Sequence, residues 1–422
     1  MIDLKYIREN KEYVKEKVSL KNEKVDVDQL VSLVEKKNAL QQQLDSRKQE
    51  RNEKSKQIGE LTRRKEDVSQ LLENMQEMSR NIKETDKIIA DLQVQIQEIL
   101  DWVPNLPHDS VPTGKSEADN KEVSAWGDIP QLDFKPKTHW ELGDNLNIMD
   151  LAAGAKMSGS NFPLLKGQGS RLIRALINFM LDIHLDKHGY KEIWPPYLVR
   201  ATSMYGTGQL PKLREDMYYS DEDELFLIPT AEVPLTNIHR DEILPAGSLP
   251  LLYTAWTPCF RREAGSYGKD TRGILRVHQF DKVEMVQLVY PEKSYEHLEM
   301  LRFHAEEILR LLELPYRVIE LCTADLSFAA AKCYDLEVYA AGVDDYLEVS
   351  SCSNFEDFQA RRANIRFKRS EDSSTEYVHT LNASGLALPR TVIALMENNQ
   401  LPDGRIRIPP VLVPYMGAKY IE

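Results

Sequence analysis

The first 102 residues contain no proline and one glycine, Gly59, so no residue in this part of the chain forces a helix to stop. Along residues 71–99, apolar side chains recur at alternating steps of four and three, and only Thr85 in the series is polar. This spacing is typical of a coiled-coil seam. The seam comprises Leu71, Met75, Met78, Ile82, Thr85, Ile89, Leu92, Ile96 and Ile99. We therefore expect an antiparallel helical hairpin spanning about residues 29–101, with its turn near 66–69.

The first limb of this hairpin carries a local excess of positive charge. Residues 36–65 contain ten Lys or Arg and four Asp or Glu, whereas the whole chain has a net charge of −13. Composition alone favours a solvated helical face or a protein–protein coiled coil. The alternative is an arm that follows a phosphate backbone, since a polyanion repelled by the whole chain is attracted by this segment.

Length and composition set further bounds. A chain of 422 residues can form two or three domains. The four cysteines form no C-x-x-C pair, so we expect neither a disulfide framework nor zinc. No apolar run approaches the ~18 residues of a membrane span, so we expect a cytoplasmic protein with no membrane partner. Pro104 and Pro107 end the helical part, and we place the domains at 1–103 and 104–422.

Two runs around a basic, glycine-bearing loop predict a long hairpin near residues 253–289. Arg261 and Glu263 lie two residues apart at the end of the first run. In the second run, predicted as a strand over 274–289, alternation places Phe280, Lys282 and Glu284 on one face. A guanidinium grips phosphate, a ring stacks on a base and a carboxylate accepts from an amino group, so this face suits a nucleotide. A lone Arg-x-Glu is more often a locally paired surface hairpin.

Other segments offer polar groups that fit this hypothesis. Pro229 and Pro234 predict a fixed loop that presents a hydroxyl and a carboxylate, on Thr230 and Glu232. A strand over 346–351 carries Glu348 and Ser351, two oxygen ligands that suit a hard cation. We also predict a helix over 385–399, with Pro389 in its first turn and Arg390 beside it.

The segment before these predicts a helix followed by a strand. Residues 170–188 have helical periodicity, and Ser170 is predicted to cap the helix. Residues 190–199 predict a strand that Pro195 and Pro196 interrupt.

Phe-Arg-x-Glu-Ala-Gly-Ser-Tyr-Gly at 260–268, followed by His-Gln-Phe-Asp-Lys-Val-Glu at 278–284, resembles motif 2 of bacterial seryl-tRNA synthetases, a class II family. The helix, strand and proline order at 170–199 resembles motif 1, and Arg390 after Pro389 resembles motif 3. The resemblance implies an α+β fold, an antiparallel sheet flanked by helices behind a two-helix coiled-coil arm. It also implies a homodimer, with the basic arm binding tRNA(Ser).

The implied reaction is ATP-dependent activation of L-serine and its transfer to tRNA(Ser), and it stays open whether tRNA(Sec) is charged too. Arg261 and Arg390 are implied to be catalytic, and Glu348 and Ser351 to bind Mg²⁺. The residues implied to bind serine are Thr230, Ala231, Glu232, Arg261, Glu284, Asn382 and Ser384. The residues implied to bind ATP are Arg261, Arg262, Glu263, Val277, Phe280, Glu348, Val349, Ser350, Ser351 and Arg390.

Two alternatives stay open. One is a synthetase-like paralogue that loads a small amino acid onto a carrier protein, against which the intact basic arm argues. The other is a coiled-coil interaction protein with a catalytically dead body. The complete charged set argues against it: Arg261, Glu263, Glu284, Glu348 and Arg390.

Overall fold

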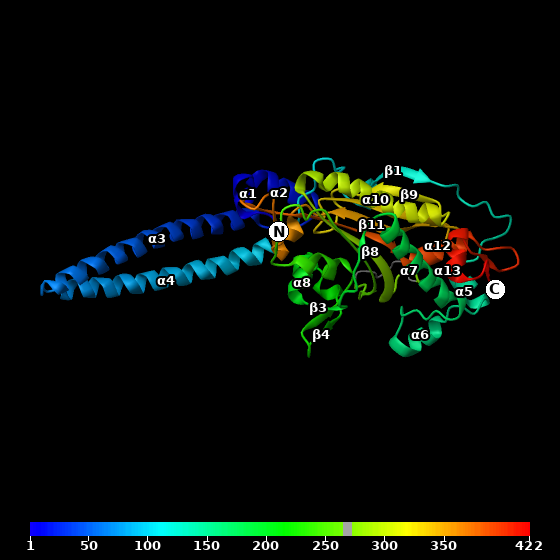
Figure 1. Ribbon diagram of the computed structural model, residues 1–422, viewed down its shortest axis with the longest axis horizontal. Coiled ribbons are helices and arrows are strands. Elements are labelled where there is room, and N and C mark those ends of the chain that lie inside the picture. The colour runs from blue at the N-terminus through cyan, green and yellow to red at the C-terminus, as the bar shows by residue number, and fades with distance from the viewer. Residues whose placement is uncertain (265–271) are drawn as a thin grey trace. The chain divides into compact units, whose positions relative to one another are not determined.

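The computed structural model describes residues 1–264 and 272–422 (Figure 1). These residues form two compact units, Met1–Pro104 and Asn105–Glu422. The glycine-bearing tip predicted between the two strands lies mostly at 265–271, outside the described residues. Within the described ranges, no helix is both long enough and apolar enough to cross a membrane.

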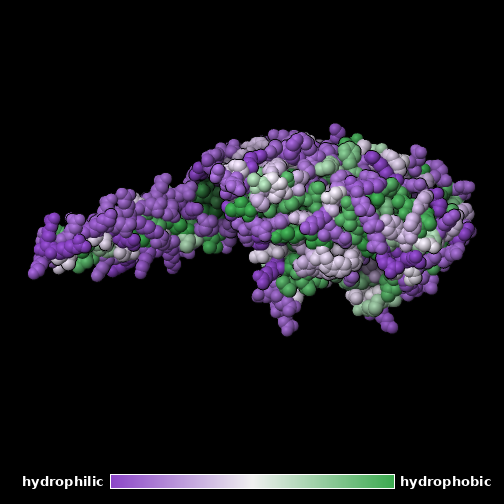
Figure 2. All heavy atoms as spheres, viewed as in Figure 1, coloured by the Kyte–Doolittle hydropathy of each residue, from purple (hydrophilic) through white to green (hydrophobic). Residues whose placement is uncertain are grey.

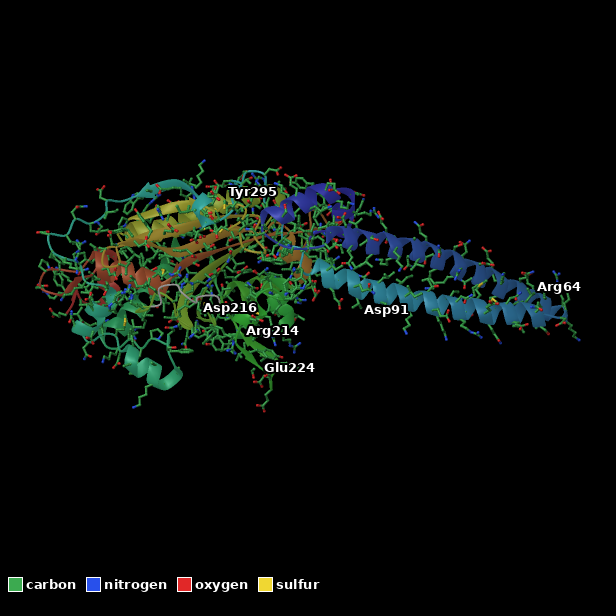
Figure 3. All side chains as sticks on the ribbon, turned by 180° about the vertical axis from the view of Figure 1, so that it is seen from behind. Arg64, Asp91, Arg214, Asp216, Glu224 and Tyr295 are labelled. Carbon is green, nitrogen blue, oxygen red and sulfur yellow. The ribbon has the colours of Figure 1, made fainter. Side chains whose placement is uncertain are left out.

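The first unit is helical, as its lack of proline predicts. Its helices are α1 (Leu4–Glu9), α2 (Lys11–Leu20), α3 (Val27–Arg63) and α4 (Ser69–Leu100). With 37 residues, α3 is about 55 Å long. The helices α3 and α4 lie side by side in Figure 1 and are joined by residues 64–68, so the turn predicted at 66–69 begins two residues earlier. Arg64 lies at this end of the pair (Figure 3).

The seam predicted in the second limb is confirmed. Ile82, Leu92 and Ile96 are buried, and the other seam positions are half-buried. Most positions between them are exposed, and hydrophilic side chains dominate the visible face of the pair in Figure 2. The buried residues of α3 are Val27, Leu30, Val31, Val34 and Leu44. Nearer the turn, half-buried side chains pack between α3 and α4. The Lys48–Asp86 ion pair, whose Nζ and Oδ1 atoms lie 3.0 Å apart, also links the two helices.

The second unit is built on a mixed, mostly antiparallel sheet. In the described part of the chain this sheet has eight strands, in the order β1-β9-β10-β11-β14-β8-β7-β2. Among these eight strands, as far as the structure describes them, β2 and β7 pair in parallel and the other neighbours pair antiparallel. The strands are β1 (Lys121–Trp126), β2 (Lys191–Glu192), β7 (Leu251–Phe260), β8 (Gln279–Val289), β9 (Tyr316–Glu320), β10 (Lys332–Ala340), β11 (Asp345–Asn354) and β14 (His379–Ala387).

Helices and small sheets surround it. The helices are α5 (His139–Asn145), α6 (Leu151–Ser158), α7 (Gln168–Asp186), α8 (Ala201–Gly206), α9 (Glu232–Thr236), α10 (Ser294–Leu311), α11 (Phe358–Ala363), α12 (Leu388–Asn398) and α13 (Val413–Met416). The short strands are β3 (Leu198–Arg200), β4 (Tyr219–Ser220), β5 (Leu225–Leu227), β6 (Ile243–Leu244), β12 (Arg366–Lys368), β13 (Thr375–Tyr377), β15 (Ile406–Arg407) and β16 (Tyr420–Ile421).

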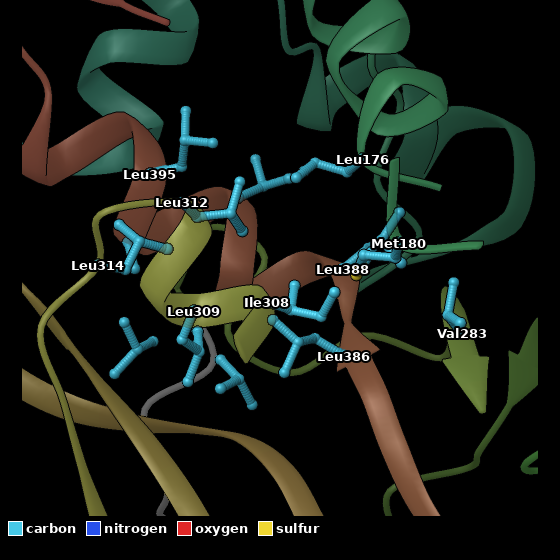
Figure 4. Close-up of a cluster of buried hydrophobic side chains, with 14 of the residues drawn as sticks. Leu176, Met180, Val283, Ile308, Leu309, Leu312, Leu314, Leu386, Leu388 and Leu395 are labelled. Atoms are coloured by element: carbon cyan, nitrogen blue, oxygen red, sulfur yellow. The ribbon is translucent and has the colours of Figure 1, made fainter. Parts of the chain in front are cut away.

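The main core lies between one face of the sheet and helices α7, α10 and α12. Figure 4 shows Leu176 of α7, Ile308 of α10 and Leu395 of α12 gathered near Val283 and Leu386 of the sheet. All five side chains are fully buried, and burying each contributes about 1.5–3 kcal/mol relative to exposure. Because side chains alternate along a strand, the residues between these core positions are left for the opposite face.

The hairpin is shorter than predicted. The β7–β8 ladder runs from Leu251–Leu288 to Phe260–Gln279, so residues 274–278 are not part of a strand. Arg261 and Glu263 also lie beyond the strand end. The last main-chain hydrogen bond between the two sides, within the described residues, runs from the Arg261 N–H to the His278 carbonyl, after which Glu263 takes a positive φ of 52° and the chain leaves the sheet.

Two register shifts bring onto one face of the sheet residues that strict alternation would place on opposite faces. In β11, Ser350 pairs with Leu336 and Glu348 with Glu337, so Val349 is an extra residue. Glu348 and Ser351 therefore share a face although they are three positions apart in the chain. In β14 the extra residue is Gly385, where a Cβ atom would lie 2.4 Å from His184 Nε2.

Three predicted boundaries are wrong. Helix α12 begins at Leu388 rather than 385, because β14 continues in register with β8 as far as Ala387. Helix α7 begins at Gln168, and its N-cap is Gly167 rather than Ser170. The strand predicted over 190–199 is divided into β2 and β3, which join different sheets.

Buried histidines connect α7 to this core. His184 Nδ1 lies 2.9 Å from His188 Nδ1, and His184 Nε2 lies 3.3 Å from the Gly385 carbonyl oxygen. Burial lowers the pKa of His184 from 6.5 to about 3. The unfolded state therefore binds a proton at pH 4–6 that the folded state does not.

We predict that this site makes the protein acid-sensitive. The free energy of unfolding should fall as pH decreases through 6.5, by up to about 1.4 kcal/mol per pH unit for one such group. His184→Gln should remove this contribution. Urea denaturation between pH 7 and pH 4 measures it as a difference in slope between wild type and variant. His239→Gln, at a half-buried site outside this cluster, is the control, and equal slopes for wild type and His184→Gln would contradict the prediction.

Candidate active site

The second unit contains a cavity of about 490 Å³ on the face of the sheet opposite the α7–α10–α12 core. Strands β8, β11 and β14 form its floor, because Phe280, Lys282, Ser351 and Ser384 alternate with core residues. The residues after β5, Arg261 and Glu263 beyond β7, and the start of α12 close its sides. Asp216, labelled in Figure 3, also lines the cavity and accepts a hydrogen bond from the Ala264 N–H.

One end of the cavity holds a buried ion pair. Lys282 Nζ lies 2.5 Å from Glu284 Oε2 and donates to Thr230 Oγ1 at 2.9 Å. Asn382 Nδ2 donates to Glu284 Oε1 at 2.8 Å. The Lys282 ammonium therefore covers Glu284 Oε2, whereas Asn382 Oδ1 has no hydrogen-bond donor among the described residues. An unsatisfied buried acceptor of this kind suits a polar ligand.

A second carboxylate, Glu232, lies close to this pair. It is the first residue of α9 rather than part of the predicted loop, and it is buried. Gln359 Nε2 donates to Glu232 Oε1 at 2.6 Å, and Gln359 in turn accepts from Thr380 Oγ1 at 2.7 Å. Burial and the charge of Glu284 raise the pKa of Glu232 to about 7. This end of the cavity is therefore built to receive a cationic group.

The middle of the cavity combines a guanidinium with an aromatic ring. Arg261 Nε donates to the Pro229 carbonyl at 3.4 Å, and its Cζ atom lies 5.3 Å from the centre of the Phe280 ring. Beyond it, Arg276 Nη1 lies 3.2 Å from Glu263 Oε2. These groups fit a phosphate and a flat heteroaromatic ring.

The opposite wall combines a second guanidinium with carboxylates. Arg390, in the first turn of α12, donates through Nη1 to the Glu348 carbonyl oxygen at 2.9 Å and lies 3.4 Å from Glu348 Oε2. Ser351 Oγ lies 3.1 Å from Cys333 Sγ. Burial and the charge of Glu348 raise the pKa of Asp335, the partner of Ser351 in the ladder, well above its usual range. A divalent cation would relieve this repulsion.

Most of the predicted site residues line this one cavity. They are Thr230, Glu232, Arg261, Glu263, Val277, Phe280, Glu348, Val349, Ser351, Asn382, Ser384 and Arg390. Glu284 contacts two lining residues, Lys282 and Asn382.

Three of the predicted residues direct their side chains elsewhere. Ala231 packs into a small core with Leu235. Arg262 donates to the Met217 carbonyl at 3.0 Å, and Ser350 Oγ donates to the Ser384 carbonyl at 2.6 Å. Ala231 and Ser350 are buried, whereas Arg262 is exposed.

Sequence reasoning assigned no role to Lys282, Gln359, Asp335 or Arg276. Lys282 shares a face with Phe280 and Glu284 on the predicted strand, so the sequence pattern already indicated its place in the cavity. No sequence pattern indicated Gln359, because it reaches Glu232 from α11, more than a hundred positions along the chain.

Comparisons with known proteins agree with this geometry. Residues 1–107 match the family model described as seryl-tRNA synthetase N-terminal domain, and residues 215–399 match the tRNA synthetase class II core domain of the G, H, P, S and T group. The chain is 57% identical over 333 residues to the serine–tRNA ligase of Geotalea uraniireducens, covering 79% of each. It is 60% identical over 320 residues to that of Kosmotoga olearia, covering 76% of this chain and 75% of the relative.

A solved structure is similar over the full length. The seryl-tRNA synthetase of Pyrococcus horikoshii, complexed with ATP, has a TM-score of 0.95 and 39% identity. The match covers 100% of this chain and 99% of that one.

We predict that the Glu232 carboxyl titrates near pH 7 in the protein without ligand. Gln359→Leu should move this pKa higher, because the hydrogen bond from Gln359 favours the ionised form. Infrared-detected titration with ¹³C-labelled glutamate measures the change, and Glu232→Gln should abolish it. Glu224→Gln, at an exposed position, is the control, and titration in the usual range of exposed carboxylates would contradict the prediction.

Proposed function

The chain belongs to the seryl-tRNA synthetases, the serine–tRNA ligases of class II, and we propose that its cavity binds serine beside Glu232 and Glu284 and ATP along Arg261, Phe280 and Arg390. The activity is ATP-dependent ligation of serine to tRNA(Ser). What most strongly supports the placing of serine is the buried Glu284–Asn382 pair, where Asn382 Oδ1 has no hydrogen-bond donor among the described residues. The hydroxyl of serine supplies a donor there.

In this proposal the ammonium of serine lies at Glu232 beside the Thr230–Ala231 main chain, and its hydroxyl faces Glu284, Asn382 and Ser384. A site built for a hydroxyl discriminates against an analogue that lacks it by about 10⁴–10⁵. Alanine is rejected on this basis, because it leaves buried acceptors unpaired.

The first step joins serine to ATP without a covalent enzyme intermediate. A carboxylate oxygen of serine attacks the α-phosphorus of ATP, the bond to the β-phosphate oxygen breaks, and pyrophosphate leaves. Arg261 neutralises the charge that develops at the α-phosphate and Arg390 holds the γ-phosphate, so catalysis consists of positioning and electrostatic stabilisation. A ribose hydroxyl of the terminal adenosine of tRNA then attacks the acyl carbon, and AMP leaves.

The adenine ring stacks on Phe280, and Glu263 accepts from its amino group. The side chain of Val277 and the main chains of Arg262 and Ser350 complete the proposed ATP contacts. Glu348 and Ser351, with Val349 between them, form the wall that would hold Mg²⁺, and the raised pKa of nearby Asp335 fits a cation there. When bound, the ion would neutralise phosphate charge.

We assign tRNA(Ser) binding to the helical unit, 1–103, and catalysis to 104–422. The positive charge of α3 suits a phosphate backbone, and RNA helices are recognised mainly by shape and backbone contacts. A homodimer is proposed through the segment from β2 to the start of β3, where Trp194 is 77% exposed and Leu198 is 48% exposed. The protein would work in the cytoplasm.

Exchange of pyrophosphate into ATP, measured with each of the twenty amino acids, tests the proposed site. We expect exchange with serine alone, without and with tRNA. Exchange with a different small amino acid would favour the carrier-loading alternative. Exchange with none would leave the helical unit as the functional part.

Arg261→Ala should lower serine-dependent exchange by about 10²-fold or more, because it removes the cation proposed at the α-phosphate. Arg405→Ala, which removes a surface partner of Asp403, is the matched control and should leave the rate unchanged. Near-wild-type exchange by Arg261→Ala would refute the proposed role.

Deleting residues 30–100 should spare serine-dependent exchange and reduce tRNA charging by about 10²-fold or more, because phosphate contacts supply much of the affinity. Replacing Lys54, Lys56, Arg63 and Arg64 by glutamate should have the same selective effect in the full-length chain. Unchanged charging by both variants would assign the helical pair to another partner.

A further inference from the structure

Lys282 is a buried ammonium group that the steps above do not use. Its side chain is 7% exposed, and it lies on β8 between paired residues of both neighbouring strands, Thr257 and Ala387. Lysine is among the side chains least often buried without a partner. Here it has two partners in the cavity, Glu284 and Thr230.

The first contact balances charge. The titratable groups that face Glu284 are Lys282 on β8, Glu232 on α9, and Cys259 and Arg261 on and after β7. Two carboxylates thus share the site with two cations. Burial raises the pKa of Glu284 and the ammonium of Lys282 lowers it, so removing that ammonium favours protonation of a carboxylate.

The second contact, with Thr230, determines whether its hydroxyl can donate to a ligand or accept from it. A hydroxyl oxygen offers two acceptor positions and one proton. Thr230 Oγ1 already accepts from Lys282 Nζ at 2.9 Å and from the Glu232 N–H at 3.1 Å. While Lys282 donates, Thr230 therefore has only its proton to offer a ligand. A substrate ammonium, which can only donate, is left to Glu232.

We propose that Lys282 is a positioning residue for serine: it keeps Glu284 charged for the hydroxyl, and it turns the Thr230 hydroxyl so that Glu232 receives the ammonium. This inference rests on the proposed function, in which the cavity binds serine. Lys282 contacts Glu284 and Thr230, the groups assigned to serine rather than to ATP. Its effect therefore falls on the affinity and selectivity for serine rather than on ATP.

The test compares Lys282→Met, Lys282→Gln and Lys282→Arg in pyrophosphate exchange from pH 6 to pH 9, with serine and with alanine. In the two neutral variants, KM for serine should rise about 10²-fold at pH 7, with KM for ATP within about twofold of wild type. The midpoint of the serine KM–pH profile should move upward, because Glu284 then ionises at higher pH. Discrimination against alanine should fall, and Lys282→Arg should recover most of the serine affinity.

The glutamine variant can still donate to Thr230, so it separates loss of charge from loss of the hydrogen bond and serves if the methionine variant does not fold. Neutral variants with the wild-type serine KM and pH profile would overturn the role of Lys282. A lower kcat with unchanged serine KM and unchanged pH profile would overturn it too, because that pattern marks a purely structural residue. If the wild-type enzyme showed no exchange with serine, the proposed site itself would fail, which separates that failure from one confined to Lys282.

Discussion

The alternation of side chains along three adjacent antiparallel strands is the constraint on which this structure depends. Strands β8, β14 and β11 each send one row of residues into the core beneath α7, α10 and α12 and the other row into the cavity. Because ladder hydrogen bonds fix the strands about 4.8 Å apart, polar groups from distant parts of the sequence are held at contact distance without flexible loops. The same apolar packing that stabilises the sheet therefore keeps the floor of the site rigid.

Charge inside the cavity is balanced locally rather than by solvent. Lys282 is paired with Glu284, Arg276 with Glu263 and Arg390 with Glu348. Glu232 and Asp335 form no salt bridge with another described residue, and in both the pKa of the carboxyl is raised. They lie at the two ends of the site proposed to receive cationic partners, the serine ammonium and Mg²⁺. A cation bound beside either carboxylate would favour its ionised form.

The sequence predicts a large part of this arrangement. Periodicity identified the coiled-coil seam, and alternation placed Phe280, Lys282 and Glu284 on one face of a strand. Resemblance to a known family was needed for the strand order, since pairing between strands far apart in the chain has no local signal. The two register shifts were missed because an extra residue such as Val349 alters no composition or periodicity that a short window detects. Glu263 was wrongly placed in a strand because a positive φ at a non-glycine residue is set by tertiary contacts.

The extra residue at Val349 has a consequence for how the enzyme can change over evolutionary time. Side chains alternate between the two faces of strand β11. One residue gained or lost on either side of the bulge therefore moves every side chain on that side to the opposite face. Losing Val349 itself would remove only the bulge, because Glu348 would still lie opposite Glu337 and Ser350 opposite Leu336. The bulge is therefore a point at which the strand can lose a residue and keep Glu348 and Ser351 on one face, whereas change elsewhere in the strand is restricted to replacement.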